Sequence, residues 1–218
     1  MKIKFEYQII LKTSGMWGSG FRTFEANSLT AWSIVDQPKN DKSVAEKIKV
    51  PCIPATYIKG LLRKSMESIE WLLKKANVID QLPGKKITDE ILGMRGDPLP
   101  SKVVITKAIA CDNQLFEKYE SKTFLEPHVR ISDSRLAAGE GTLFRELRIK
   151  PNTKFYGEIV AYPPDGRESS WIYAILLSLF NFNNMDIGKS QTFGIVKVTK
   201  YEGVPQNIEQ KIKELINL

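Results

Sequence analysis

Two basic side chains stand at the start of a sequence pattern typical of an amphipathic helix. Lys59 and Arg63 are four residues apart, so a helix places them on one face. The extended segment Ile53-Pro54 comes directly before this pattern. The first turn of a helix offers unpaired N–H groups and the positive end of the helix dipole. We therefore predict an anion site here that follows a nucleic-acid backbone. The apolar residues that recur at helical spacing and are expected to be buried are Ile58, Leu61, Leu62, Met66, Ile69, Leu72 and Leu73.

Glycines bracket a second candidate anion site near the other end of the sequence. Gly188 and Gly194 lack a Cβ, which lets the backbone between them approach a ligand closely. Lys189, Ser190 and Gln191 lie inside this loop and can donate to phosphate without reading base sequence. The spacing matches neither a Walker loop nor a dinucleotide-binding fingerprint. We predict RNA contacts, with a solvated surface charge as the alternative for the lysine.

Aromatic and guanidinium groups add further candidates for RNA contact. Trp17 and Phe21 stand between glycines, where they either stack on bases or pin a glycine-rich loop to the core. Arg130 is suited to contact the backbone or to stack on a base.

The composition favours an anionic partner without proving one. The 218 residues include 32 basic and 25 acidic ones, which gives a net charge of +7 and a pI near 9.3. A soluble basic protein without such a partner would look the same. Cys52 and Cys111 are read as buried apolar residues, because a single histidine cannot complete a zinc site with them. The sequence shows no signal peptide and no apolar run of about 20 residues, so we expect a cytoplasmic protein without a membrane partner.

The hydrophobic pattern predicts a mixed α+β protein. Alternation over residues 2–12 predicts a half-buried strand, while residues 13–53 show no sustained period and suggest a long loop. The further expectations are a helix ending near residue 76, a strand over 102–110, a hairpin of 143–150 with 154–162 around Pro151-Asn152, a helix over 171–182, a strand over 193–201 and a short helix over 208–216.

Three segments of this chain resemble motifs of the RAMP superfamily, the repeat-associated proteins of CRISPR effector complexes. The segment 53–63 is similar to the family pattern I-P-G-S-S-L-K-G-x-x-R, although 55–58 read Ala-Thr-Tyr-Ile in place of Gly-Ser-Ser-Leu. The segment 129–146 resembles the central V-R-I-D … G-x-L-F-x-x-E block, and 187–194 resembles the C-terminal glycine-rich loop. The resemblance implies a ferredoxin-like or RRM-like antiparallel sheet with helices on one face. It also implies a single domain over 1–218, with insertions at about 20–50 and 77–128.

Within that superfamily, the chain resembles the backbone subunit of type III complexes. Such a subunit binds guide RNA, meets target RNA, contacts other effector subunits and stacks head to tail with its own copies. In these subunits an I-D-x-P segment carries an aspartate needed to cut the target, and Asp36 is the matching position, with Asp41 as the fallback. One aspartate can position a hydrated Mg²⁺, or another divalent cation, against the scissile phosphate. The alternative is that Asp36 only turns the chain before Pro38.

Three other functions fit the same sequence. The first alternative is an RNA-binding RAMP subunit without catalysis. The second is a repeat-processing endoribonuclease that uses the single histidine, His128, as general base. The third is an unrelated basic domain that binds proteins.

Overall fold

The computed structural model describes residues 1–23, 26, 28–38, 45–75, 86–94, 101–112, 115–132, 137–188, 191–206, 208 and 210. Its centre is an antiparallel sheet in which β1 (Ile3–Leu11) lies between β10 (Lys154–Ala161) and β11 (Gly194–Glu202). Two short strands, β5 (Val103–Ile105) and β6 (Ala108–Asp112), follow one another along the other side of β10. The single strand expected over 102–110 is therefore two strands, separated at Thr106 and Lys107.

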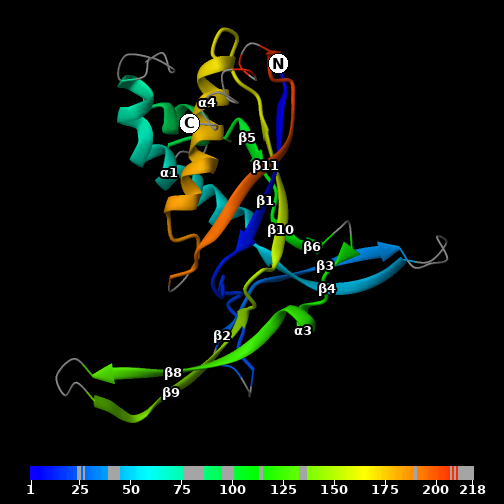
Figure 1. The fold of residues 1–218 in the computed structure, drawn as a ribbon, viewed down its shortest axis with the longest axis vertical. Helices are drawn as coiled ribbons and strands as arrows, with labels where there is room; N and C mark the ends of the chain where they lie inside the picture. The colour runs from blue at the N-terminus through cyan, green and yellow to red at the C-terminus, as the bar shows by residue number, and fades with distance from the viewer. Residues whose placement is uncertain are drawn as a thin grey trace.

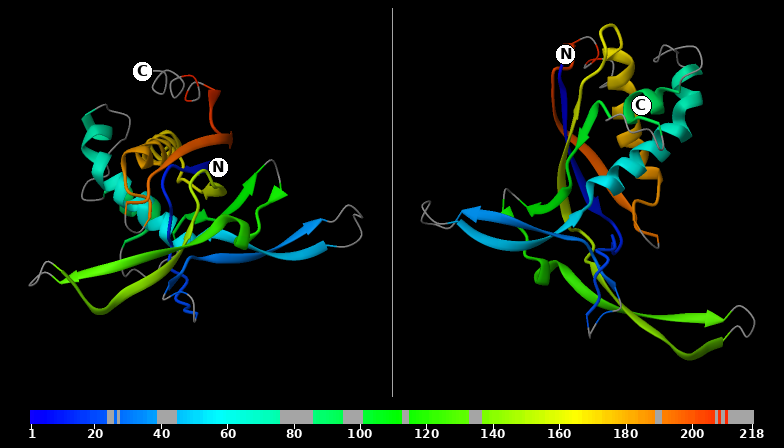
Figure 2. Two further views of the ribbon diagram at one scale, coloured as in Figure 1. Left: turned by 60° about the horizontal axis from the view of Figure 1, so that its bottom comes forward. Right: turned by 180° about the vertical axis from the view of Figure 1, so that it is seen from behind.

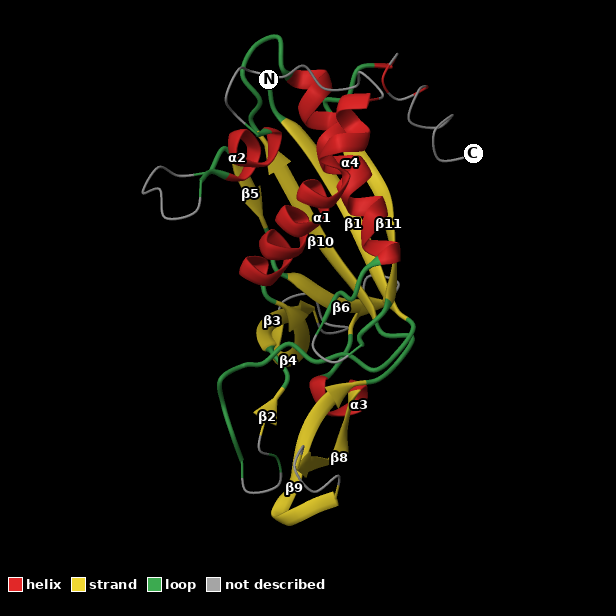
Figure 3. Cartoon of the chain, turned by 90° about the vertical axis from the view of Figure 1, so that its left-hand side faces the viewer, coloured by secondary structure: helices red, strands yellow, loops and turns green. Residues whose placement is uncertain are grey.

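Two helices cover one face of this sheet, as Figure 3 shows. They are α1 (Ala55–Lys75) and α4 (Glu168–Asn181), which is followed by a 3-10 turn at Phe182–Asn184. In chain order the core reads β1, α1, β5 with β6, β10, α4 and β11, and the spatial order β11-β1-β10-β6 is that of a ferredoxin-like fold. The predicted α+β class and sheet are confirmed.

The alternation predicted for the first strand decides which side of the sheet is buried. Ile3, Phe5, Tyr7, Ile9 and Leu11 are fully buried beneath the helices. Burial of this apolar surface is the main favourable term that holds the helices on the sheet. On α1 the predicted apolar face is also buried, except that Ile69 is only partly buried and Leu72 remains 48% exposed.

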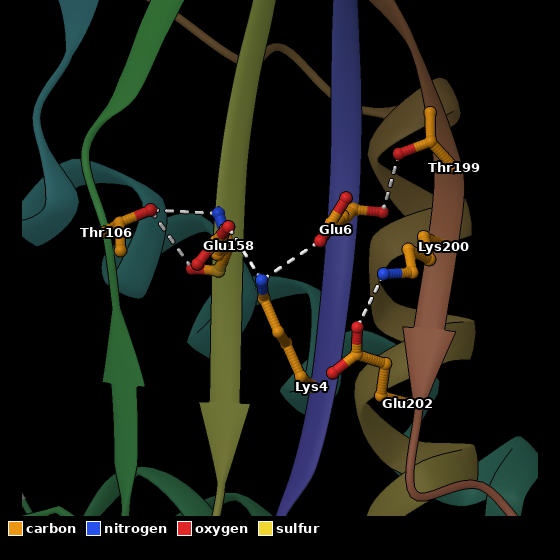
Figure 4. A network of polar contacts seen from close by, with 7 residues as sticks. All are labelled: Lys4, Glu6, Thr106, Glu158, Thr199, Lys200 and Glu202. Carbon is orange, nitrogen blue, oxygen red and sulfur yellow. Dashed lines mark hydrogen bonds and ion pairs between the residues drawn. The ribbon is translucent and has the colours of Figure 1, made fainter.

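The opposite face of the sheet carries paired charges, which Figure 4 shows in detail. The Lys4 ammonium group contacts the Glu6 carboxylate at 2.9 Å and the Glu158 carboxylate at 2.8 Å. Lys200 pairs with Glu202 at 2.6 Å on the neighbouring edge strand. Because these acidic and basic groups neutralise one another, this part of the described face attracts a phosphate backbone only weakly.

A short helix, α2 (Ile87–Leu92), ties the two long helices together. Its Glu90 carboxylate accepts hydrogen bonds from the Arg167 guanidinium at 2.8 and 3.1 Å and from the Trp171 indole N–H at 2.7 Å. Burial alone would raise the pKa of Glu90, but these hydrogen bonds and the Arg167 charge together lower it. The buried ion pair therefore anchors α2 to the start of α4.

Two hairpins project from one end of this core in different directions (Figures 1 and 2). The first consists of β3 (Trp32–Pro38) and β4 (Ala45–Ile53), and its β4 strand joins the core sheet through β6. The second consists of β8 (Thr123–Ser132) and β9 (Ala137–Ile149). The small elements around them are β2 (Ser28–Leu29), β7 (Leu115–Phe116) and α3 (Tyr119–Lys122).

The structure corrects two expectations about these segments. Residues 13–53 contain the β3–β4 hairpin and are not a single long loop. The hairpin expected between 143–150 and 154–162 is wrong, because β9 pairs with β8 whereas β10 pairs with β1. Pro151-Asn152 is a turn, and its Asn152 has a positive φ of 64°. The Asn152 N–H donates to Leu11 at 2.8 Å, so the turn redirects the chain into the core sheet.

The remaining elements agree with the sequence pattern. The long helices α1 and α4 and the last strand β11 are found where the pattern predicts them. Most of the expected terminal helix over 208–216 lies outside the described residues.

Candidate nucleic-acid interface

A groove of about 750 Å³ opens beside the first turn of α1. The helix begins there because the Pro54 carbonyl accepts the N–H groups of Tyr57 at 3.0 Å and Ile58 at 3.1 Å. Thr56 lies inside this first turn. The groove is mostly apolar. Its walls come from residues 18–21, from the β3–β4 hairpin and from the break between β5 and β6. The residues that line it include Phe21, Trp32, Ala55, Thr56, Thr106 and Lys107.

Two aromatic rings and one ammonium group stand at this groove. The Phe21 and Trp32 ring centroids are 6.4 Å apart with a tilt of 33°, and Phe21 is 62% exposed. Exposed rings of this kind are suited to stack on unpaired bases. The exposed Lys107 directs its ammonium group toward Ser33 Oγ at 2.6 Å, at the base of the β3–β4 hairpin. Lys107 was not among the residues that the sequence analysis proposed, because its isolated position gives no motif.

The pairing register places Asp36 among basic residues. Side chains alternate along a strand, so Trp32, Ile34 and Asp36 lie on the same face of the β3–β4 hairpin. Across the hairpin, Asp36 is paired with Lys47 and Ile34 with Lys49. Directly paired residues project to the same face. Asp36 is exposed. The hairpin face that starts at the groove therefore carries two lysines and one exposed carboxylate.

The two basic residues of the α1 motif have different environments. Arg63 is only 11% exposed at its side chain, and its guanidinium group contacts the Asp89 carboxylate at 2.9 Å and donates to the Gly93 carbonyl. Because Asp89 of α2 already occupies the guanidinium group, we expect Arg63 to hold the fold together rather than to bind phosphate. Lys59 is half-buried, and within the described residues it forms no ion pair. It stays a predicted phosphate contact.

Backbone N–H groups of the glycine-rich loop, residues 187–194, donate to the carboxylate of the preceding residue, Asp186. Asp186 accepts the backbone N–H groups of Gly188 at 3.1 Å, Gln191 at 2.9 Å and Thr192 at 2.9 Å. These amides are therefore not free for a phosphate, which corrects the expected role of the loop backbone. A Cβ at Gly188 would lie 2.6 Å from Thr192, so this glycine permits close packing within the loop. The missed signal was Asp186, which stands just before the motif.

The Trp17 side chain connects this loop to α1. It is 2% exposed, and its indole N–H donates to the Ile187 carbonyl at 3.0 Å. Its ring contacts Tyr57 edge-on with centroids 6.5 Å apart and Phe155 with centroids 5.7 Å apart. Of the two roles that the sequence leaves open for Trp17, the structure shows the one in the core, because the ring is buried and therefore not exposed to a base. Two of the motifs noted in the sequence, 53–63 and 187–194, thereby come together through Trp17.

Exposed groups remain on both sides of this junction. Tyr57 is 36% exposed in the first turn of α1, and Phe193 is 45% exposed at the end of the glycine-rich loop. Burial, with a smaller contribution from the Asp186 charge, raises the pKa of the Tyr57 hydroxyl. Tyr57 therefore remains a neutral hydrogen-bond donor at neutral pH. Gln191 is exposed as well and has a positive φ of 58°.

Several predicted site residues cannot be placed. Lys189, Ser190 and Asp41 lie outside the described residues. Arg130 belongs to β8, but its side chain also lies outside the described part of the structure. Their roles, together with that of the exposed Gln191 side chain, stay predictions.

His128 lies in a cross-strand cluster on the β8–β9 hairpin. Its ring stacks on Phe144 with centroids 5.2 Å apart, and its Nε2 atom is 3.5 Å from carboxylate oxygens of both Glu126 and Glu146. Arg148 pairs with the same Glu126 oxygen at 3.0 Å. This cluster lies on the β8–β9 hairpin, whereas Asp36 lies on the β3–β4 hairpin, and the two hairpins do not pair with each other in the described residues.

At the position predicted for a divalent cation, the described side chains supply one carboxylate ligand, that of Asp36. Among the side chains that the structure describes, no group of three or more His, Cys, Asp or Glu residues is arranged to hold a metal ion. Asp36 is a single exposed carboxylate. A lone carboxylate suits Mg²⁺ only where phosphate oxygens and water complete the coordination.

Comparison with known proteins assigns the family. The sequence model of the RAMP superfamily matches residues 33–216, so this chain belongs to the RAMP superfamily. The fold is similar to that of a chain in the cryo-EM structure of the type III-B Cmr-beta bound to cognate target RNA, with a TM-score of 0.56 and 18% sequence identity. The match covers 92% of this chain but 60% of that one. No curated protein matches the sequence. In the described part of the chain, no helix has the length and apolar character of a membrane span.

Proposed function

We propose that this protein is a subunit of a type III CRISPR effector complex and binds guide RNA along the groove at the start of α1. The observation that carries the proposal is the meeting of the exposed Phe21 ring and the partly buried Trp32 ring with Lys107 at this groove, within a RAMP fold. In this proposal Lys47, Lys59 and Lys107 contact phosphates, while Phe21 and Trp32 stack on bases. Backbone contacts of this kind hold RNA without reading its sequence, which guide–target pairing supplies.

The charge balance of the molecule supports this location. The face of the sheet opposite the helices pairs its own charges, as Lys4 does with Glu6 and Glu158. Within the described residues, Lys47 and Lys59 have no ion-pair partner. A polyanion gains most where cations are not already neutralised, so it is expected at the groove and along the β3–β4 hairpin.

Binding to single-stranded RNA at several salt concentrations tests this proposal. The double variant Lys47→Glu with Lys107→Glu is expected to weaken binding at least about tenfold and to reduce the slope of log K against log salt by about 0.7 for each lost contact. Lys197→Glu is the matched control, because Lys197 is an exposed lysine on β11 that is paired with Gln8 across the open sheet face. Equal losses in the double variant and the control would overturn the groove assignment.

We further propose that Asp36 takes part in cutting target RNA. Its support is its exposed position on a projecting hairpin, beside basic residues, where a bound strand would pass. A divalent cation bound there would stabilise the charge on the phosphate while the adjacent 2′-OH attacks the phosphorus and the 5′-oxygen leaves. Asp36 would bind water molecules of the ion, and Lys47 would contact the phosphate.

Cutting by the assembled complex tests the role of Asp36. With Mg²⁺ present, Asp36→Ala is expected to lower the cutting rate at least about a hundredfold with unchanged RNA affinity. Asp36→Asn separates the loss of charge from the loss of the side chain. Undiminished cutting by Asp36→Ala would show that this carboxylate is not catalytic; Asp41→Ala would then be the next variant, and a non-catalytic RNA-binding subunit would remain as the function if it too cut normally.

Assembly with other subunits and head-to-tail stacking of copies belong to the same proposal. A head-to-tail contact does not close on itself and so continues along a strand. Light scattering of the purified protein with RNAs of increasing length is expected to show a mass that rises in steps of one subunit. A constant mass would contradict stacking.

A further inference from the structure

We propose that Lys49 is a positioning residue that fixes the β3–β4 hairpin, and with it Asp36, against α3 and the base of the β8–β9 hairpin. The inference about the hairpin rests on contacts within the protein. Its consequence for target cutting rests on the proposed function of Asp36.

The Lys49 ammonium group lies between two aromatic rings from different elements. Its Nζ atom is 4.8 Å from the ring centroid of Trp32 on β3 and 4.0 Å from that of Tyr119 on α3. Both distances are within the range of a cation–π interaction, which extends to about 6 Å. The charge is therefore shared by two rings that belong to separate parts of the chain.

The Tyr119 ring is itself held in place. It is 3% exposed, and its hydroxyl donates to the Thr30 carbonyl at 2.9 Å. The Thr123 hydroxyl, in the first residue of β8, donates to the Tyr119 carbonyl at 2.8 Å. Tyr119 thus links the chain just before β3 to the start of β8. Lys49 adds β4 to this linkage, so that the two projecting hairpins share one anchor.

The position of Lys49 differs from that of the other lysine on the same face. Lys47 is two residues away on β4 and exposed, and the described rings near Lys49 do not contact it. Lys47 is suited to bind phosphate directly, whereas Lys49 is bound by the rings. Lys47 is therefore a matched control for the loss of one positive charge from the same strand and face.

Hydrogen exchange of the intact protein without RNA tests the anchor. Lys49→Met keeps most of the apolar stem and removes the charge, so amides of β3 and β4 are expected to exchange about 5- to 30-fold faster than in the wild type. Lys49→Arg is expected to restore protection, because a guanidinium group also binds aromatic faces. Lys47→Met is expected to change exchange less than about twofold. Equal exchange in the Lys49→Met and Lys47→Met proteins would overturn the proposal.

A second variant tests whether the effect of Lys49→Met comes from the ring contact or from a general loss of structure. Tyr119→Leu removes one ring, and in that background Lys49→Met is expected to add less than half of its original effect on β3–β4 exchange. Full additivity would show that the ring and the ammonium group act independently, contrary to the proposal.

Cutting assays separate positioning from RNA binding. In the assembled complex, Lys49→Met is expected to lower the cutting rate at saturating target about tenfold while target affinity changes less than twofold, and Lys49→Arg is expected to recover the rate. A loss of affinity equal to that of Lys47→Met would mean that Lys49 contacts phosphate, which contradicts the inference. If the complex does not cut even in the wild type, the proposed role of Asp36 fails, whereas the exchange result still decides the anchor.

Discussion

Replacing Arg63 should reduce the stability of the fold and leave RNA binding nearly unchanged. In the wild type, the Arg63 guanidinium group contacts the Asp89 carboxylate at 2.9 Å and donates a hydrogen bond to the Gly93 carbonyl, and the substitution removes both contacts. The charged guanidinium group is the donor in both hydrogen bonds, and each bond of this kind contributes about 1.5–3 kcal/mol. Asp89 is 32% exposed, so water partly replaces the lost contact. We expect Arg63→Ala to cost about 3 kcal/mol of unfolding free energy, which lowers the Tm by about 6–12 °C.

Lys59 provides the matched control on the same helix. It precedes Arg63 by one helical turn and has no ion-pair partner among the described residues. Lys59→Ala is expected to change the Tm by no more than about 2 °C and to weaken RNA binding a few-fold, whereas Arg63→Ala does the reverse. The assays are thermal unfolding by circular dichroism and fluorescence anisotropy with single-stranded RNA, both at fixed salt and well below the Tm of each variant.

A double-mutant cycle refines the test. If Arg63 and Asp89 stabilise the fold through each other, their substitutions together should cost less than the sum of the single costs, by about 1–2 kcal/mol. An Arg63→Ala protein that keeps the wild-type Tm but binds RNA tenfold more weakly would show that Arg63 contacts RNA and does not stabilise the fold.

Three further predictions concern other contacts of the fold. Glu90→Gln should lower the free energy of unfolding by about 2–4 kcal/mol, because the mostly buried Arg167 loses the charge of Glu90. Since the folded-state pKa of Glu90 is lowered, this stabilisation is present above about pH 4.5 and is lost as the pH falls further, so urea unfolding of the wild type and the variant should converge in acid. Gly157→Ala should lower the free energy of unfolding by about 1–3 kcal/mol, because the added Cβ would lie 2.5 Å from the Tyr7 hydroxyl oxygen and 2.7 Å from the Tyr7 Cζ atom. Tyr7→Phe removes only the hydroxyl contact and should recover only part of the loss, whereas an unchanged Tm in Gly157→Ala would contradict the clash. Asp186→Ala should speed exchange of the amides at 188, 191 and 192 at least about tenfold, whereas an unchanged rate would mean that the carboxylate does not hold the loop.

Local patterns of apolar residues predicted most of the core elements. The alternation of Ile3, Phe5 and Tyr7 and the helical spacing along α1 each depend on residues close in sequence, so the pattern is visible without the fold. The prediction of a hairpin between 143–150 and 154–162 was wrong because strand pairing depends on residues distant in sequence. Two adjacent strand patterns suggest a hairpin, but the partner of each strand is chosen by distant segments, β8 for β9 and β1 for β10.

The family, the class of fold and the positions of the main helices and strands could be predicted from the amino-acid sequence, because motifs and periodicity are local properties of the chain. Which candidate groups a ligand can reach depends on the folded protein. Lys59 and Arg63 look equivalent at helical spacing, yet α2 brings Asp89 to Arg63 alone. Lys49 and Lys47 share a face, yet α3 brings a ring to Lys49 alone. Contacts between segments distant in sequence set the surroundings of each charge, and these surroundings decide whether the charge holds the fold together or remains available to a ligand.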